Sequence, residues 1–118
     1  MGLETQAIFP GHLTAENVAG LLSVECQVKT AIVRAMHRPE YKVIEFVDDA
    51  GKQQAMNLFL NSYAASDYEV VFTGASTLAT LEFSPSNFAV LSALAAATGG
   101  YVQRISGEPW SQVAVQVV

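Results

Sequence analysis

The sequence predicts an α+β fold, mainly an antiparallel sheet with two or three helices packed on one face. Two pairs of β-rich segments are separated by short turns, which is typical of antiparallel hairpins. A long apolar segment between a Ser-Pro start and a Gly-Gly end is typical of a helix. At 118 residues the chain has the size of one domain with its own core, so we treat residues 1–118 as a single domain.

The apolar helix within Phe83–Val102 is the element around which we expect the domain to be built. Ser84-Pro85 can cap and start it, and Gly99-Gly100 can end it in the left-handed conformation. Ser92 is the one polar residue in its middle, and a helix that is apolar nearly all round belongs in an interior. We therefore predict a central, covered helix that leads into a strand over Tyr101–Ile105.

The N-terminal half predicts a strand, a helix and a hairpin. Leu3–Phe9 alternates apolar and polar residues, as a half-buried strand does. Thr14 can cap a helix whose Glu16 lies in the first turn, where the helix dipole favours an acid. Gln27–His37 is rich in β-branched residues, and Tyr41–Val47 returns after a turn, so these two segments predict a hairpin.

The segment Asp49–Tyr63 fits either a helix or a strand. Helical spacing gathers its apolar residues on one face and its Gln and Asn residues on the other. Strand parity separates them less well, because Asn57 then shares a face with Phe59. We therefore predict a helix over this segment, with a strand over Lys52–Leu60 as the alternative.

The rest of the chain predicts strands on either side of the apolar helix. Tyr68–Thr73 and Thr77–Phe83 predict a second hairpin across the turn Gly74-Ala75-Ser76, and Ser111–Val118 predicts a last strand. An internal repeat is visible in outline, because in each half a Phe and a Pro precede a helix that is followed by two strands.

Composition and charge argue against two classes of partner. A net charge of −5 is wrong for a protein that binds nucleic-acid phosphates, and it disfavours an anionic membrane surface. Hydrophobic residues make up 51% of the chain and charged residues 14%, and charges become scarce after Phe83. We therefore expect that another chain covers apolar surface in the C-terminal third.

The compartment is predicted from the cysteine content and the N-terminus. The single Cys26 cannot form an internal disulfide, which fits a reducing compartment. The first residues lack the basic start and the long apolar run of a signal peptide. We therefore expect a cytoplasmic protein.

The candidates for catalysis are His37, Glu40, Tyr41 and Cys26. Cys26 can act as a thiol nucleophile if His12 or His37 lies beside it as a base and a third group orients that base. His37 and Glu40 can share a proton at the tip of the predicted hairpin. A lone cysteine is more often a buried core residue, and charges at a hairpin tip more often solvate the turn, so we predict no catalytic residue.

We expect neither a metal nor a cofactor. Two histidines, one cysteine and scattered acids lack the ligand spacing of a zinc site. Asp48-Asp49 begins like a calcium loop, but Gly51 and Gln53 then occupy ligand positions. The glycines are isolated and predict no nucleotide-binding loop.

The leading functional hypothesis is a small, non-catalytic interaction or assembly module that self-associates, with a homodimer favoured. The predicted last strand contains neither the Lys nor the Pro that commonly protects an exposed sheet edge, so a second protomer would cover it. The expected interface lies near the C-terminus and comprises Tyr101, Val102, Trp110, Val113, Val115 and Val117. Trp110 fits the core as well as it fits an interface.

Two other functions stay open. The first is a small enzyme or small-molecule-binding protein with a pocket between the sheet and the helices. The second is an acidic inhibitor that presents Glu40, Glu45, Asp48 and Asp49 to a basic partner. Five of the six basic residues lie in the same part of the chain, which weakens the second hypothesis.

Overall fold

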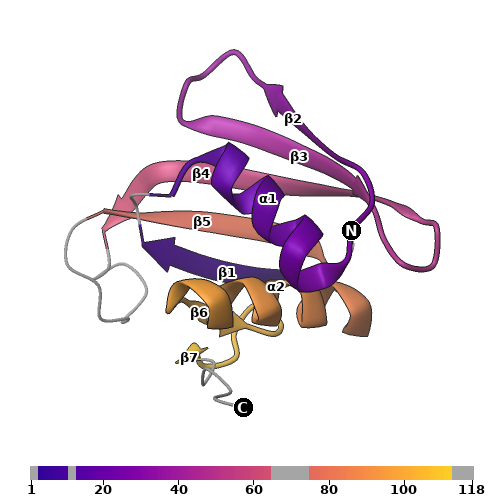
Figure 1. Cartoon of the computed structure of the whole chain (residues 1–118). Helices are drawn as coiled ribbons and strands as arrows, with labels where there is room; N and C mark the ends of the chain where they lie inside the picture. Colours follow the sequence, from indigo (N-terminus) through magenta and orange to yellow (C-terminus); the bar gives the residue numbers. More distant parts are fainter. Residues whose placement is uncertain (1–2, 11–12, 65–74, 113–118) are drawn as a thin grey trace.

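The structure is a computed structural model that describes residues 3–10, 13–64 and 75–112. A sheet forms one layer and two helices form the other (Figure 1). In chain order the elements are β1 (Glu4–Pro10), α1 (Ala15–Cys26), β2 (Ala31–Ala35), β3 (Tyr41–Val47), β4 (Gln53–Ala64), β5 (Ala75–Glu82), α2 (Pro85–Thr98), β6 (Tyr101–Gln103) and β7 (Ser111–Gln112). The α+β prediction is confirmed, and the described part of the chain contains two helices.

Within the described residues the sheet has seven strands in the order β2-β3-β4-β5-β1-β6-β7, and all neighbouring pairs are antiparallel. The first strand of the chain therefore lies inside the sheet, between β5 and β6. Strands β2 and β7 form its two edges. Both helices lie on the same face, with α1 over the β2–β3 side and α2 over β1, β5 and β6 (Figure 1).

The hydrophobic core fills the space between the helices and the sheet. Every second residue of a central strand points toward the helices, which is the pattern of a sheet covered on one face. The largest side chains that are fully buried in this layer come from both helices and from β1, β3, β4 and β5: Phe9, Val18, Leu22, Ile44, Phe46, Met56, Leu58, Leu81, Leu91 and Leu94.

Helix α2 begins and ends as the sequence predicts. The Ser84 side chain accepts a hydrogen bond from the Asn87 backbone N–H, Pro85 is the first helical residue, and Gly99 is left-handed with φ +74°. The prediction of a helix covered all round is wrong, because its outer positions, Pro85, Ser86, Ala89 and Ala97, are exposed. Alanine presents little apolar surface there, so the helix needs no second covering layer.

The predicted helix over Asp49–Tyr63 is wrong. The first residues of this segment belong to the turn between β3 and β4, and the rest forms strand β4. Strand β4 pairs with β3 on one side and β5 on the other, so its backbone is satisfied in the middle of the sheet. Asn57 does share a face with Phe59, and it is stabilised there by neighbouring strands. Its amide accepts a hydrogen bond from the Tyr41 hydroxyl at 2.8 Å and donates one to Thr80 Oγ1 at 3.4 Å.

Other predictions have mixed outcomes. The first strand, the Thr14 cap and the β2–β3 hairpin are confirmed. The turn predicted at Gly74-Ala75-Ser76 is wrong in part, because Ala75 and Ser76 begin β5 and pair with β4. Tyr68–Thr73 lies outside the described residues, and the last strand is described only to Gln112. The internal repeat is not confirmed, because α1 is followed by four described strands before α2 begins, and not by two.

The sheet face opposite the helices carries an apolar row that crosses five strands. The register places Tyr41 beside Phe59, Phe59 beside Leu78, Leu78 beside Ile8, and Ile8 beside Tyr101. The rings of Tyr41 and Phe59 stack with their centroids 5.1 Å apart. Cross-strand pairs of this kind stabilise a sheet and hold its register.

A buried amide connects helix α2 to the sheet. Asn87 is 1% exposed, and its Nδ2 donates hydrogen bonds to Gln54 Oε1 at 3.1 Å and to the Glu82 carbonyl at 2.9 Å. Gln54 Nε2 in turn donates to Asp48 Oδ2 at 3.0 Å. Asn87 therefore ties the start of α2 to β4, β5 and the β3–β4 turn.

We expect Asn87→Ala to lower the free energy of unfolding by about 1–3 kcal/mol, because the Glu82 carbonyl and the half-buried Gln54 amide lose the donor that ties them to α2. Thermal or urea unfolding followed by circular dichroism measures the loss. Ser86→Ala changes the exposed neighbour on the same helix and should stay within about 0.5 kcal/mol of the wild type. Equal stability of the two variants would contradict the structural role of Asn87.

Candidate functional site

The structure does not bring the candidate Cys26 together with the candidates His37 and Glu40. Cys26 ends helix α1, next to the turn that follows β3. His37 and Glu40 lie in the turn that precedes β3. The seven residues of β3 separate the two places by roughly 20 Å, at about 3.4 Å per residue. His37 therefore cannot serve as the base for Cys26, and His12 lies outside the described residues.

Glu40 has a partner in the β2–β3 turn, and Tyr41 has partners on β4. Glu40 accepts a hydrogen bond from Arg38 Nε at 2.6 Å. A hydrogen bond from the Glu40 backbone and the Arg38 side chain lower the pKa of this carboxyl group, so it is ionised at neutral pH and has no proton to donate. Tyr41 stacks on Phe59 and donates its hydroxyl proton to Asn57, as described above. These contacts support the interpretation of a solvated turn.

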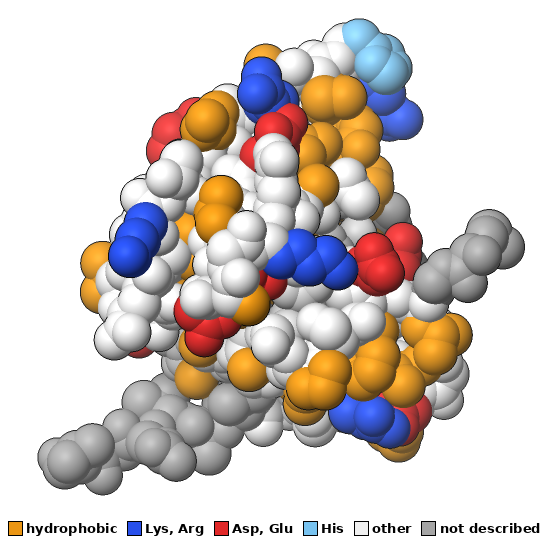
Figure 2. Space-filling model, turned by 90° about the vertical axis from the view of Figure 1, so that its right-hand side faces the viewer, with side chains coloured by type: hydrophobic (Ala, Val, Ile, Leu, Met, Phe, Trp, Pro, Cys, Tyr) orange, Lys and Arg blue, Asp and Glu red, His pale blue; other side chains and the backbone are white. Residues whose placement is uncertain are grey.

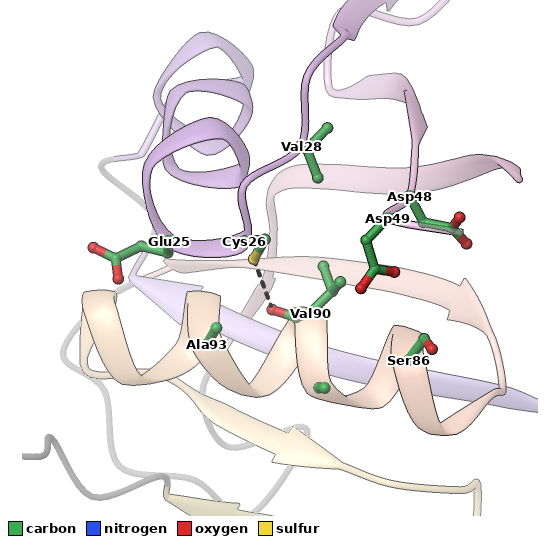
Figure 3. Close-up of a pocket in the computed structure, with 9 residues that line it drawn as sticks. Glu25, Cys26, Val28, Asp48, Asp49, Ser86, Val90 and Ala93 are labelled. Carbon is green, nitrogen blue, oxygen red and sulfur yellow. Dashed lines mark hydrogen bonds between the residues drawn. The ribbon is translucent and has the colours of Figure 1, made fainter. Parts of the chain in front are cut away.

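A pocket of about 270 Å³ lies between the end of α1, the β3–β4 turn and the N-terminal half of α2 (Figure 3). Its apolar wall consists of Val28, Ala89, Val90 and Ala93. Cys26 lies between the two helices, and its Sγ donates a weak hydrogen bond to the Val90 carbonyl at 3.8 Å. The polar side chains at the rim are Glu25, Asp48, Asp49 and Ser86.

The β3–β4 turn closes one side of this pocket, and Asp48 holds the turn together. Its Oδ1 accepts hydrogen bonds from the backbone N–H groups of Ala50 at 3.0 Å and Lys52 at 2.8 Å. Gly51 adopts φ +82°, which the turn requires and which glycine allows. Hydrogen bonds from Gln54 and Lys52 lower the pKa of Asp48. Its charge is therefore already engaged within the turn.

The acids around the pocket do not converge on one point. Figure 3 shows the Asp49 carboxylate directed toward α2, whereas those of Glu25 and Asp48 point away from Cys26 in opposite directions. Within the described residues, no group of three His, Cys, Asp or Glu side chains could hold a metal ion. The arrangement thus offers an apolar hollow with a negative rim, but no pair of groups placed for proton transfer.

Cys26 is a poor nucleophile in this position. Burial, and to a smaller extent the negative charge of Glu25, raise the pKa of the Cys26 thiol to about 11. Because the thiolate is the reactive form, the folded protein keeps Cys26 protonated and unreactive at neutral pH. Because this pKa is higher in the folded protein than in the unfolded chain, the folded state is stabilised when Cys26 is a thiol and not a thiolate. This stabilisation is present below the ordinary pKa of 9.0 and is lost as the pH rises through about 11.

We expect iodoacetamide to alkylate Cys26 about 100-fold more slowly at pH 8 in the folded protein than in the urea-unfolded chain, which is the ratio of the two thiolate fractions. Mass spectrometry of timed samples measures both rates. The folded-state rate should keep rising with pH beyond 9 and reach half of its limiting value near pH 11. Equal rates in the folded and unfolded chains would show that Cys26 is accessible and ordinary.

No protein-family model, curated protein or solved structure matches this chain. Neither helix in the described part of the chain is long and apolar enough to cross a membrane.

The edge strand β2 is the clearest feature of the molecular surface. It lies at the upper boundary of the sheet in Figure 1, and among the described residues it pairs only with β3. Ile32 is 48% exposed and Met36, just beyond the strand, is 39% exposed. Figure 2 shows hydrophobic side chains gathered at the top of the molecule, the β2 end, and again at the bottom. The edge at β2 thus presents apolar surface.

The residues predicted for a C-terminal interface lie in different surroundings. Val102 packs in the core and is 2% exposed, and Tyr101 and Trp110 are half-buried. Val113, Val115 and Val117 lie outside the described residues. An interface at β2 is not predicted from the sequence. The only local signal is a five-residue run with four apolar residues, which fits half of a hairpin equally well.

Proposed function

We propose that the protein is a small, non-catalytic interaction module that self-associates, and that it works in a reducing compartment such as the cytoplasm. The observation that carries this proposal is the unprotected edge of the sheet at β2. Natural proteins commonly protect an edge strand with Lys, Pro or a bulge. Strand β2 has no Pro and no Lys, and its one charged residue, Arg34, is paired with Glu45 of β3. Its register with β3 runs without a shift from Ala31 to Ala35.

The surroundings of β2 support the same proposal. Ile32, Met36 and Val47 are each more than a third exposed and lie on or beside this edge. The chain has a low fraction of charged residues, 14%, so its surface has few charges with which to keep copies apart. An exposed strand flanked by apolar side chains is a template for pairing with another chain.

A small-molecule-binding function is the second candidate, and the pocket beside Cys26 favours it. An apolar wall and a negative rim would suit a small organic cation. The acids point apart, and Asp48 is already engaged in the turn, so the pocket lacks the convergent polar groups of a specific binding site. The acidic-inhibitor hypothesis is weaker still, because Glu40 and Glu45 are paired with Arg38 and Arg34.

The test of the proposed function is the molar mass in solution. Size-exclusion chromatography with light scattering, over a range from low to high micromolar protein, should show a mass that rises above the monomer mass of 12.6 kDa. A constant monomer mass at the highest concentration would overturn the proposal. Calorimetric titration of the same sample with small amines would then test the pocket.

A further inference from the structure

We infer that two copies pair through their β2 strands, antiparallel and around a two-fold axis at Val33, so that the two sheets become one continuous sheet. This inference rests on the proposed self-association and names its surface and register. It follows from three features of β2: which backbone groups point outward, which side chains would face each other, and where the charges fall.

The backbone groups that point outward can be assigned from the hydrogen bonds at the ends of β3. The Val47 N–H donates to the Thr30 carbonyl at 3.3 Å, so Thr30 and Val47 form a hydrogen-bonded pair. In an antiparallel ladder such pairs alternate, so Ile32 and Arg34 also bond to β3. The other edge of β3 agrees. The Glu40 carbonyl accepts a hydrogen bond from Leu60 of β4, and the Asp48 N–H donates one to the Lys52 carbonyl, so even-numbered residues along β3 bond toward β4 and odd-numbered ones toward β2.

The remaining residues of β2, namely Ala31, Val33 and Ala35, therefore direct their N–H and C=O groups away from the sheet. A second copy centred on Val33 sets Ala31 opposite Ala35 of the second copy, Val33 opposite Val33, and Ala35 opposite Ala31. Each of these is a hydrogen-bonded pair that exchanges two bonds, so the full strand contributes about six hydrogen bonds. All five residues of each strand take part.

The side chains are self-complementary in this register. Ala31, Val33 and Ala35 lie on the helix side of the sheet, because they pair with Phe46, Ile44 and Lys42. Ala31 and Val33 already pack at the margin of the core. Pairing would join these small apolar side chains across the two-fold axis, and it would extend the core layer of one copy into that of the other.

Charge selects this register over its neighbours. With Val33 on the axis, Arg34 lies opposite Ile32 of the second copy, and its charge stays paired with Glu45 of its own chain. A shift by two residues in one direction sets Arg34 against Arg34, which is unfavourable. The opposite shift places the two-fold axis at Ile32. Only two hydrogen-bonded pairs, and not three, then lie within the strand.

A disulfide at the axis tests the register. In Cys26→Ala/Val33→Cys, hydrogen-bonded partners would lie about 5.5 Å apart at Cα, which a disulfide can bridge. The matched control is Cys26→Ala/Ile32→Cys on the same strand. Its two cysteines would lie roughly 8 Å apart, from a strand spacing of about 4.8 Å and a two-residue offset, which is too far. Mild oxidation at low micromolar protein and non-reducing electrophoresis compare the two.

We expect a covalent dimer from Val33→Cys and little or none from Ile32→Cys. A wild-type protein that is dimeric by light scattering, but whose Val33→Cys variant forms no more covalent dimer than the Ile32→Cys control, overturns this inference and leaves the proposed self-association intact. Preferential crosslinking of Ile32→Cys overturns the register. A wild-type protein that stays monomeric overturns both the inference and the proposed function.

A second variant tests the pairing without a crosslink. Ala35→Pro removes an outward N–H, and the bond to β3 is not lost because Ala35 faces Lys42 in a non-hydrogen-bonded pair. Each dimer loses two hydrogen bonds, so the dimer dissociation constant should rise about tenfold. Circular dichroism checks that the fold is kept. An unchanged dissociation constant in a folded variant places the interface elsewhere.

Discussion

Replacement of Leu94 by aspartate should abolish folding of the domain. Leu94 lies on α2 with 0% exposure, in contact with the core that joins both helices to the sheet. An ionised carboxylate without a partner in an apolar site costs several kcal/mol, and the whole domain is stabilised by about 5–15 kcal/mol. Expression in the soluble fraction and a thermal melt followed by circular dichroism measure the outcome.

The matched control for Leu94→Asp is Ser86→Asp on the same helix. Ser86 is exposed and lies in the first turn of α2, where a negative charge interacts favourably with the helix dipole. This variant should melt cooperatively, within a few degrees of the wild type. A soluble Leu94→Asp protein with a similar cooperative melt would show that α2 does not anchor the core.

Helix α2 could be predicted from the sequence because its signals are local. Ser84 caps the backbone N–H of Asn87, three residues away, and Gly99 ends the helix by its own conformation. No distant part of the chain is needed to produce either effect. The prediction that the helix is covered all round was wrong because exposure depends on distant parts of the chain. The local sequence does not specify which alanines face solvent.

Strand β4 could not be predicted because its decisive contacts are distant. On a strand, Asn57 shares a face with the apolar Phe59, which argues against a strand. In the structure Asn57 is hydrogen-bonded there to Tyr41 and Thr80, which lie 16 and 23 residues away. Helical spacing gave a cleaner separation of polar and apolar residues, but it took no account of these partners. Pairing on both edges then overrides the local preference.

The candidate interface depends on the order of the strands, which local patterns do not specify. The β2–β3 hairpin was predicted, but the hairpin alone does not show which of its strands is free. β4 pairs with β3 and leaves β2 at the boundary, and β1 inserts between β5 and β6 at the other end of the sheet. The pocket beside Cys26 has the same origin, because it forms where the β3–β4 turn meets two helices.

Gly100→Ala should destabilise the domain by about 3 kcal/mol and lower the melting temperature by roughly 10 °C. Gly100 joins α2 to β6 and is buried against β1. A Cβ at this position would lie 2.5 Å from the Ile8 carbonyl oxygen and 3.1 Å from Phe9 Cδ1. The nearer contact is backbone in the middle of the sheet, so relief requires either β1 or the start of β6 to move.

The matched control is Gly20→Ala, in the middle of α1. A Cβ there meets nothing within 4 Å, and alanine is the better helix former by about 1 kcal/mol, so this variant should be as stable as the wild type or more so. Urea unfolding of both variants, fitted with a common m-value, gives the two free energies. Because the chemical change is identical, opposite signs would locate the cost of Gly100→Ala in the contact with Ile8. A Gly100→Ala protein as stable as Gly20→Ala would mean that β1 and the α2–β6 junction are not packed this closely.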